Sequence, residues 1–233
     1  MSTKYSSEGL YNPQTSKRRS IIALNWKNTQ TVETAWVLIK TVEDISNIYT
    51  DYSWIVFPGD DLIDSLATKV SLGLQSPTTD STLPYCLIGH MSQRLEWKTD
   101  EEIQKELESL IDTTIIPIVC VGPLREEDTL ESVLKQQLVI LEKWPKEKKI
   151  IIAYEPGFAV WTGKTMTLED IEIIYDILSE ALKTFTQIHI IYGGSVNDKN
   201  IAGILRITDG VIIGTASQKS SSLLAISIAL WQD

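Results

Sequence analysis

The chain has 233 residues and carries 31 acidic against 21 basic side chains, which gives a net charge of −10. This length allows one sizeable core, and one barrel or doubly wound domain fits it as well as two small domains do. The negative charge removes the driving force for binding nucleic acid or an anionic membrane over the whole surface, so neither is an expected partner. An anionic substrate must therefore be held by local positive charge.

The sequence contains no apolar run that approaches the roughly 18 residues of a membrane span. Residues 1–20 lack the apolar centre of a signal peptide, so we expect a mobile N-terminal extension followed by a single domain at 21–233. Cys86 and Cys120 lie in strand-like apolar runs, where free thiols packed as small hydrophobes are favoured over a disulfide. Free thiols suit a reducing, cytoplasmic location.

Eight short strand-like runs alternate along the chain with segments of helical period. The predicted strands span residues 21–25, 54–57, 70–74, 85–89, 115–121, 150–155, 188–192 and 210–213. The predicted helices span residues 33–48, 62–68, 100–111, 127–143, 168–184, 198–206 and 217–231. Thr99 with Glu102, and Thr167 with Asp170, have the spacing of capping boxes, which mark two of these helix starts.

Strands that alternate with helices favour a parallel sheet, and eight repeats in about 210 residues favour a closed (β/α)8 barrel over an open doubly wound sheet. One connection differs from the others, because residues 75–84, QSPTTDSTLP, have no helical period. Fully extended they span about 33 Å, against about 17 Å for a five-residue strand, so the chain can return without a helix. We therefore expect an α/β barrel with the helix between strands 3 and 4 missing or shortened.

Polar residues at the carboxyl ends of barrel strands are candidates for catalysis, whereas those at the other end mostly serve stability. Asn25 and Lys27 follow the first predicted strand, His90 the fourth and Glu155 the sixth. His189 stands at the start of the seventh predicted strand, so we interpret it as structural. The seventh and eighth strands run into YGGS and IIGTAS.

From residue 21 onwards, five motifs resemble triosephosphate isomerase, in that family's order and at the expected strand ends. They are NWK at 25–27, GH at 89–90, AYEP at 153–156, TGKT at 162–165 and YGGSV at 192–196. The resemblance implies a TIM-barrel enzyme that interconverts glycerone phosphate and D-glyceraldehyde 3-phosphate in glycolysis and gluconeogenesis, with a small phosphorylated triose as its partner. It implies no metal or organic cofactor, and nothing else in the sequence asks for one.

Aldose–ketose isomerisation needs a base that removes a proton beside a carbonyl and an electrophile that stabilises the enediolate. By resemblance the base is Glu155 and the electrophile is a neutral His90, a pair of roles for which this family is itself the well-known example. Lys27 would supply fixed positive charge over the substrate oxygens, and Asn25 would help to place both. The alternative interpretations are that Glu155 is a surface carboxylate, that His90 is a core histidine and that Lys27 is a solvated lysine.

The phosphate of the substrate requires closely approaching backbone donors, which glycine and helix N-termini provide. Gly193, Gly194 and Ser195 after the seventh strand, with Gly214 and Thr215 after the eighth, stand where barrels of this class bind phosphate. Ordinary tight turns are the alternative for each group alone.

The segment before the helix predicted at 168–184 also invites a nucleotide-binding interpretation. A Walker A loop would need glycine at Phe158, but the glycine is Gly157, so the spacing excludes it. By resemblance the segment is instead a lid that closes over the substrate and excludes water. The predicted lid comprises Pro156, Gly157, Phe158, Ala159, Val160, Trp161, Thr162, Gly163, Lys164, Thr165 and Met166. Trp161 replaces a glycine of the family's usual PVWAIGTGKT. We predict that Trp161 forms a packing contact when the lid closes and belongs to the residues that bind the substrate or its phosphate.

Other departures concern turnover and assembly. The family follows its histidine with Ser-Glu-Arg, but here Met91, Ser92 and Gln93 follow His90, so the carboxylate that pairs with the active-site lysine is absent. A neutral Gln93 would hold Lys27 less firmly, and Gln93→Glu is then expected to raise kcat. The third βα connection, which normally inserts into the partner of a homodimer, is short and lacks TGE, which favours a monomer or a different dimer contact.

Three alternatives compete with the isomerase interpretation. A catalytically weakened phosphate-binding barrel is favoured by Met91 and Gln93, but opposed by the joint retention of the four catalytic candidates. A Schiff-base aldolase would want a lysine within a strand, and Lys27 stands just past one. A phosphosugar epimerase would usually need a metal or paired acidic residues.

Overall fold

The computed structural model describes residues 19–96, 98–125, 128–157 and 165–231. Within them eight parallel strands close into a barrel in sequence order, with the last strand hydrogen-bonded to the first. The expected barrel is confirmed. The strands are β1 Ser20–Asn25, β2 Tyr52–Phe57, β3 Ser71–Leu74, β4 Tyr85–Ile88, β5 Ile116–Val121, β6 Ile150–Tyr154, β7 Ile188–Tyr192 and β8 Gly210–Ile213.

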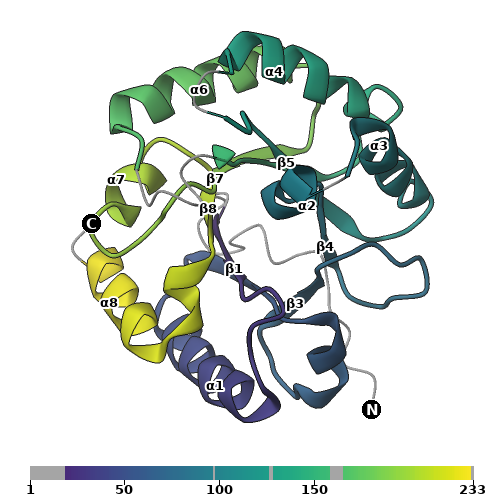
Figure 1. Cartoon of the computed structure of the whole chain (residues 1–233). Helices are drawn as coiled ribbons and strands as arrows, with labels where there is room; N and C mark the ends of the chain where they lie inside the picture. Colours follow the sequence, from purple (N-terminus) through teal and green to yellow (C-terminus); the bar gives the residue numbers. More distant parts are fainter. Residues whose placement is uncertain (1–18, 97, 126–127, 158–164, 232–233) are drawn as a thin grey trace.

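The helical elements follow the predicted order with several changes of length and type. They are α1 Val32–Ile48, η2 Asp60–Ser65, α2 Met91–Glu96, α3 Asp100–Ser109, α4 Leu130–Gln137, η3 Leu138–Leu141, α6 Leu168–Ala181, α7 Ile201–Leu205, η4 Thr215–Gln218 and α8 Ser220–Trp231. Figure 1 shows the longer helices α1, α3, α4, α6 and α8 around the outside of the ring of strands. Residues 75–84 contain no helix, as predicted. The expected extension at 1–20 falls almost entirely outside the described residues, and β1 begins at Ser20.

Three helix predictions need correction. The element expected as a helix at 62–68 is a 3-10 helix that begins two residues earlier, and the one expected at 127–143 changes from α to 3-10 geometry at Leu138. The short helix α2 is absent from the prediction, because it has no apolar period and its buried residues are Met91 and Arg94. The guanidinium of Arg94 can be buried because it donates to the carbonyl oxygens of Gly89 and Cys120.

Side chains at both predicted capping sites satisfy free N–H groups at the start of a helix. Thr99 and Glu102 form a complete capping box at α3. Thr167 caps α6 by accepting from the backbone N–H of Asp170, so this predicted start is confirmed without the reciprocal bond. No helix among the described residues is long and apolar enough to cross a bilayer.

The alternation of side chains along the strands separates two cores and directs the site. One core fills the barrel lumen and includes Ile21 and Ala23 of β1 and Ile151 and Ala153 of β6. Their neighbours in sequence face the helices and belong to a second core. Since successive side chains alternate between faces, the next lumen positions are residue 25 after Ala23 and residue 155 after Ala153. The strand pattern therefore carries two predicted catalytic residues to the same end of the barrel.

Candidate active site

A cavity of about 630 Å³ opens at the carboxyl end of the barrel. Four predicted catalytic residues share its wall, although they stand at or just after the ends of three different strands, β1, β4 and β6. The full lining comprises Asn25, Lys27, His90, Glu155, Gly193, Ser195, Val196, Asn197, Ile212, Gly214, Thr215, Ala216, Lys219 and Ser222. His189, interpreted as structural, instead lies within β7 in register with Ile151.

Glu155 follows β6 with its side chain almost completely buried; the residue is 2% exposed. Its backbone N–H donates to the carbonyl oxygen of Val121 at 2.8 Å, which fixes the strand end. Carboxylate atom Oε2 accepts from the backbone N–H of Met91 at 3.1 Å, and Oε1 lies 3.6 Å from Nε2 of His90. A buried carboxylate with so few donors is costly to retain for structure alone, which points to a chemical role.

Gly193, which follows β7, makes room for this carboxylate. A Cβ atom placed there would lie 2.7 Å from Cγ of Glu155 and 2.5 Å from a methyl carbon of Ile212. Real Cβ contacts are essentially never that short, so a side chain at this position would have to displace the glutamate and the isoleucine.

His90 follows a turn at Gly89, whose φ of +64° is accessible to glycine at little cost. Its Nδ1 lies 2.8 Å from Oγ of Ser92 and 3.3 Å from the backbone nitrogen of the same residue. A backbone N–H can only donate, so Nδ1 acts as the acceptor there. In the neutral ring the proton then belongs on Nε2, the atom that faces Glu155 and the cavity.

Asn25 and Lys27 lie together at the end of β1. The backbone N–H of Lys27 donates to Oδ1 of Asn25 at 3.0 Å, and Lys27 has a φ of +54°, which is uncommon for a residue with a side chain. Among the described residues, no hydrogen bond or ion pair involves the Lys27 ammonium group. Its positive charge therefore faces the cavity without a carboxylate partner in that part of the chain.

The predicted phosphate residues form another part of the cavity wall. Ser195, Gly214 and Thr215 line it, whereas Gly194 is buried behind the wall, where a Cβ atom would lie 2.3 Å from Oη of Tyr192. Ser195 has a φ of +48°, and its carbonyl oxygen accepts from the side-chain amides of Asn197 and Asn200. These bonds hold the turn after β7 in a conformation that a serine seldom adopts.

Sequence reasoning misses three polar lining residues: Asn197, Lys219 and Ser222. Lys219 falls inside the predicted helix at 217–231, where a lysine is expected on the helix surface. The structure begins α8 at Ser220, which leaves Lys219 on the preceding connection at the cavity. A basic residue a few positions beyond a barrel strand is the signal that could have found it.

The predicted lid is only partly described. Pro156 and Gly157 follow Glu155, and the backbone N–H of Gly157 donates to the carbonyl oxygen of Pro123 at 2.7 Å. A Cβ atom on Gly157 would lie 2.9 Å from the carbonyl oxygen of Leu124, so this glycine permits a close approach between two loops. Residues 158–164, with Trp161, lie outside the described residues, and the prediction for Trp161 stays a prediction.

The expected contact between Gln93 and Lys27 is wrong. Oε1 of Gln93 accepts from Nζ of Lys98 at 3.1 Å, and Lys98 also contacts Glu106. The reason is that Gln93 lies on α2, on the side toward α3, where a lysine competes for its carbonyl oxygen. Gln93→Glu is therefore no longer expected to raise kcat.

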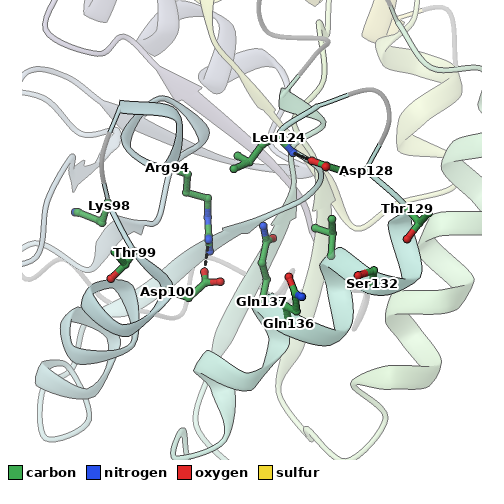
Figure 2. Close-up of a pocket in the computed structure, with 11 residues that line it drawn as sticks. Arg94, Lys98, Thr99, Asp100, Leu124, Asp128, Thr129, Ser132, Gln136 and Gln137 are labelled. Carbon is green, nitrogen blue, oxygen red and sulfur yellow. Dashed lines mark hydrogen bonds and ion pairs between the residues drawn. The ribbon is translucent and has the colours of Figure 1, made fainter.

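A second, polar cavity of about 370 Å³ lies outside the barrel, beside α3 and α4, and Figure 2 shows its lining. Arg94 contacts Asp100 there, while also donating to the two strand-end carbonyls named above. Gln137 accepts from the N–H of Gly122 at 2.7 Å and donates to its carbonyl oxygen at 3.0 Å. These side chains fix the ends of β4 and β5 from behind the candidate active site.

Both cysteines are free and buried, as predicted. Burial raises the pKa of the Cys120 thiol well above its ordinary range, and the nearby Glu155 carboxylate adds to the effect. Burial raises the pKa of Cys86 as well. Both thiols thus stay protonated and neutral near neutral pH, so Cys120 packs in the lumen beside Glu155 without adding a second negative charge.

A closed (β/α)8 barrel with a buried carboxylate, an imidazole and a lysine at its carboxyl end defines a barrel enzyme suited to proton transfer. The sequence model of triosephosphate isomerase matches residues 75–230. Proteins named triosephosphate isomerase from Francisella tularensis subsp. mediasiatica (strain FSC147) and Dictyoglomus turgidum (strain DSM 6724 / Z-1310) are each 33% identical to this chain. The alignments cover 87% and 88% of this chain, and 93% and 97% of the relatives. The chain belongs to the triosephosphate isomerase family, whose members are isomerases.

Proposed function

We propose that this enzyme interconverts glycerone phosphate and D-glyceraldehyde 3-phosphate through an enediolate. The observation that carries the proposal is the arrangement of His90 and Glu155, whose Nε2 and Oε1 atoms are 3.6 Å apart at one cavity wall. Glu155 removes a proton from the carbon beside the carbonyl and returns it to the neighbouring carbon. His90 gives its Nε2 proton to the oxygen on which negative charge develops and takes up the proton of the neighbouring hydroxyl group, so that the imidazole is neutral again at the end of the reaction.

Burial favours this chemistry. Glu155 accepts one backbone N–H, from Met91, and lies at the end of a lumen filled by apolar side chains. A closed, apolar surrounding keeps water away from the carboxylate and from the reactive intermediate. Asn25 and Lys27 provide an amide and a positive charge for the substrate oxygens in the same cavity.

The phosphate of the substrate occupies the wall after β7 and β8. Ser195, Gly214 and Thr215 supply backbone and hydroxyl donors there, and Gly194 supports their turn. Lys219 adds positive charge on this side, which a phosphate needs in a chain whose net charge is −10. The lid at 156–166, including Trp161, would exclude water over the bound substrate. Cytoplasmic location and the departure from the usual homodimer stay predictions.

A second function is a phosphate-binding barrel with weakened catalysis. The observation that favours it is the Lys27 ammonium group: no carboxylate contacts it within the described residues, and Ser92 stands where a glutamate would follow the histidine without a gap. The missing carboxylate would make the position of the Lys27 ammonium group less precise but would leave the Glu155–His90 pair unchanged. We therefore favour retained catalysis.

The test follows the reaction in D₂O by NMR with D-glyceraldehyde 3-phosphate as the substrate. Isomerisation through an enediolate gives product with deuterium on the carbon that receives the proton, because the intermediate and Glu155 exchange protons with solvent. Product formation at the rate of a buffer blank, combined with tight binding of 2-phosphoglycolate, would replace the isomerase proposal with the binding function.

A further inference from the structure

Gln75, the first residue after β3, lies close to Asn25 and forms hydrogen bonds through both its side chain and its backbone N–H. Its side-chain nitrogen Nε2 donates to Oδ1 of Asn25 at 2.9 Å and to the carbonyl oxygen of Phe57 at 2.8 Å. Its backbone N–H donates to Oδ1 of Asp60 at 2.8 Å. Both N–H groups of the side-chain amide are thus used, and the backbone cannot turn away without breaking a third bond.

These bonds determine the orientation of the Asn25 amide. Oδ1 of Asn25 accepts from Gln75 and from the backbone N–H of Lys27 at 3.0 Å. A flipped amide would place its NH₂ group against both of these donors, so the network selects one orientation. Asn25 is 1% exposed, and its Nδ2 atom has no hydrogen-bond partner among the described residues. A buried donor of this kind is costly unless a ligand in the cavity satisfies it.

The same bonds reach Lys27. Its backbone has a φ of +54°, and the bond from its N–H to Asn25 is the local contact that supports this conformation. If Asn25 rotates, this contact is lost, and the lysine backbone can relax to an ordinary conformation that points its ammonium group elsewhere. One hydrogen bond thus links Gln75 to Asn25, and a second links Asn25 to Lys27.

We propose that Gln75 is a positioning residue, which orients Asn25 and through it Lys27 toward the substrate oxygens. The inference rests on the proposed function. The connection that carries Gln75 has no helix, and its first residue supplies the hydrogen bond to Asn25 from within the same chain. Gln75 itself does not line the cavity.

A double-mutant cycle tests the role. Gln75→Leu removes both side-chain donors at similar size, and Asn25→Ala removes the group through which Gln75 acts. We expect Gln75→Leu to lower kcat/KM about 10- to 100-fold in the otherwise unchanged enzyme, because small misplacements of substrate-contacting groups are costly. In the Asn25→Ala background the same change should lower kcat/KM less than about threefold, since coupled residues are not additive. The Kd for 2-phosphoglycolate should follow the same pattern.

Gln187→Leu is the matched control. Its side-chain amide also donates to a backbone carbonyl, that of Glu147 at 2.7 Å, but it precedes β7 at the far end of the barrel. This variant should keep kcat/KM within about twofold of the parent enzyme. Thermal unfolding of all variants distinguishes misplaced side chains from loss of the fold. If Gln75 had a purely structural role, Gln75→Leu would lower the unfolding midpoint and would lower kcat/KM by the same factor in both backgrounds.

Each outcome decides something. If the wild-type enzyme turns over and the kcat/KM losses of Gln75→Leu and Asn25→Ala simply multiply in the double variant, the role of Gln75 is rejected and the isomerase proposal stands. The same holds if Gln75→Leu loses no activity. If the wild-type protein binds 2-phosphoglycolate but does not turn over, the isomerase proposal is rejected. The double-mutant cycle measured on the Kd for 2-phosphoglycolate then still tests whether Gln75 acts through Asn25. A wild-type chain that neither turns over nor binds the inhibitor rejects both.

Discussion

Nε2 of His90 lies 3.6 Å from Oε1 of Glu155. The two residues are far apart in the sequence, since Met91, the residue after His90, is 64 positions before Glu155. This distance is too long for a good hydrogen bond. The imidazole N–H and the carboxylate are therefore not consumed by each other, and each can act on a different atom of a substrate between β4 and β6.

The first prediction concerns the histidine and its neighbour. His90→Asn should lower kcat about 10²- to 10³-fold, the usual cost of removing one donor to a developing oxyanion. Ser92→Ala keeps the backbone N–H that faces Nδ1 and should cost less than about tenfold in the same assay. Equal losses for the two variants would mean that the Ser92 hydroxyl, rather than its N–H, sets the tautomer.

Gly193→Ala should lower kcat by about tenfold or more, because the added Cβ would lie 2.7 Å from Cγ of Glu155 and must push the carboxylate away. Gly203→Ala in α7 is the control, since its Cβ would meet only the flexible end of Leu168. The two kcat values are measured beside thermal unfolding. A normal kcat for Gly193→Ala would show that the glutamate does not need the space this glycine leaves.

Much of this arrangement could be predicted from the sequence, because the barrel pattern and the strand-end rule depend on local order. Asn25, His90 and Glu155 each stand at or just after the end of an apolar run, so their place at one end of the barrel follows from the strand assignment alone. The contact of Gln93 with Lys98 could not be predicted, because it depends on how α2 packs beside α3. Gln75 also follows a strand, but its role appears only when the hydrogen bonds to Asn25 and Phe57 are seen.

Gly157→Val, which restores the residue usual in the family, should destabilise this chain by about 1–3 kcal/mol. The reason is the Cβ distance of 2.9 Å to the carbonyl oxygen of Leu124 and 3.0 Å to that of Pro123. Urea unfolding of the variant and the parent protein measures the difference. An unchanged midpoint would indicate that the 123–124 backbone moves aside without cost.

Stability should fall in alkaline solution. Burial raises the pKa of the two thiols from 9.0, and raises the pKa of Tyr85 and Tyr192 from 10.0 to about 12. These groups titrate at lower pH in the unfolded chain, so their contribution is complete below about pH 9 and is lost as the pH rises through the folded-state values. Urea unfolding at about pH 8 and about pH 10.5 should show the loss, and Cys86→Ala should reduce it. A free energy of unfolding that stays level between these pH values would contradict the burial of these groups.

The most direct test of the central claim is kcat for Glu155→Gln and Glu155→Asp in a coupled isomerase assay. Glu155→Gln cannot accept the proton and should lower kcat about 10²- to 10⁴-fold. Glu155→Asp keeps the charge one methylene further from the substrate and should show a smaller loss. Glu131→Gln, on the exposed first turn of α4, is the control and should match the parent enzyme. Turnover that is indifferent to both changes at Glu155 would contradict its assignment as the base.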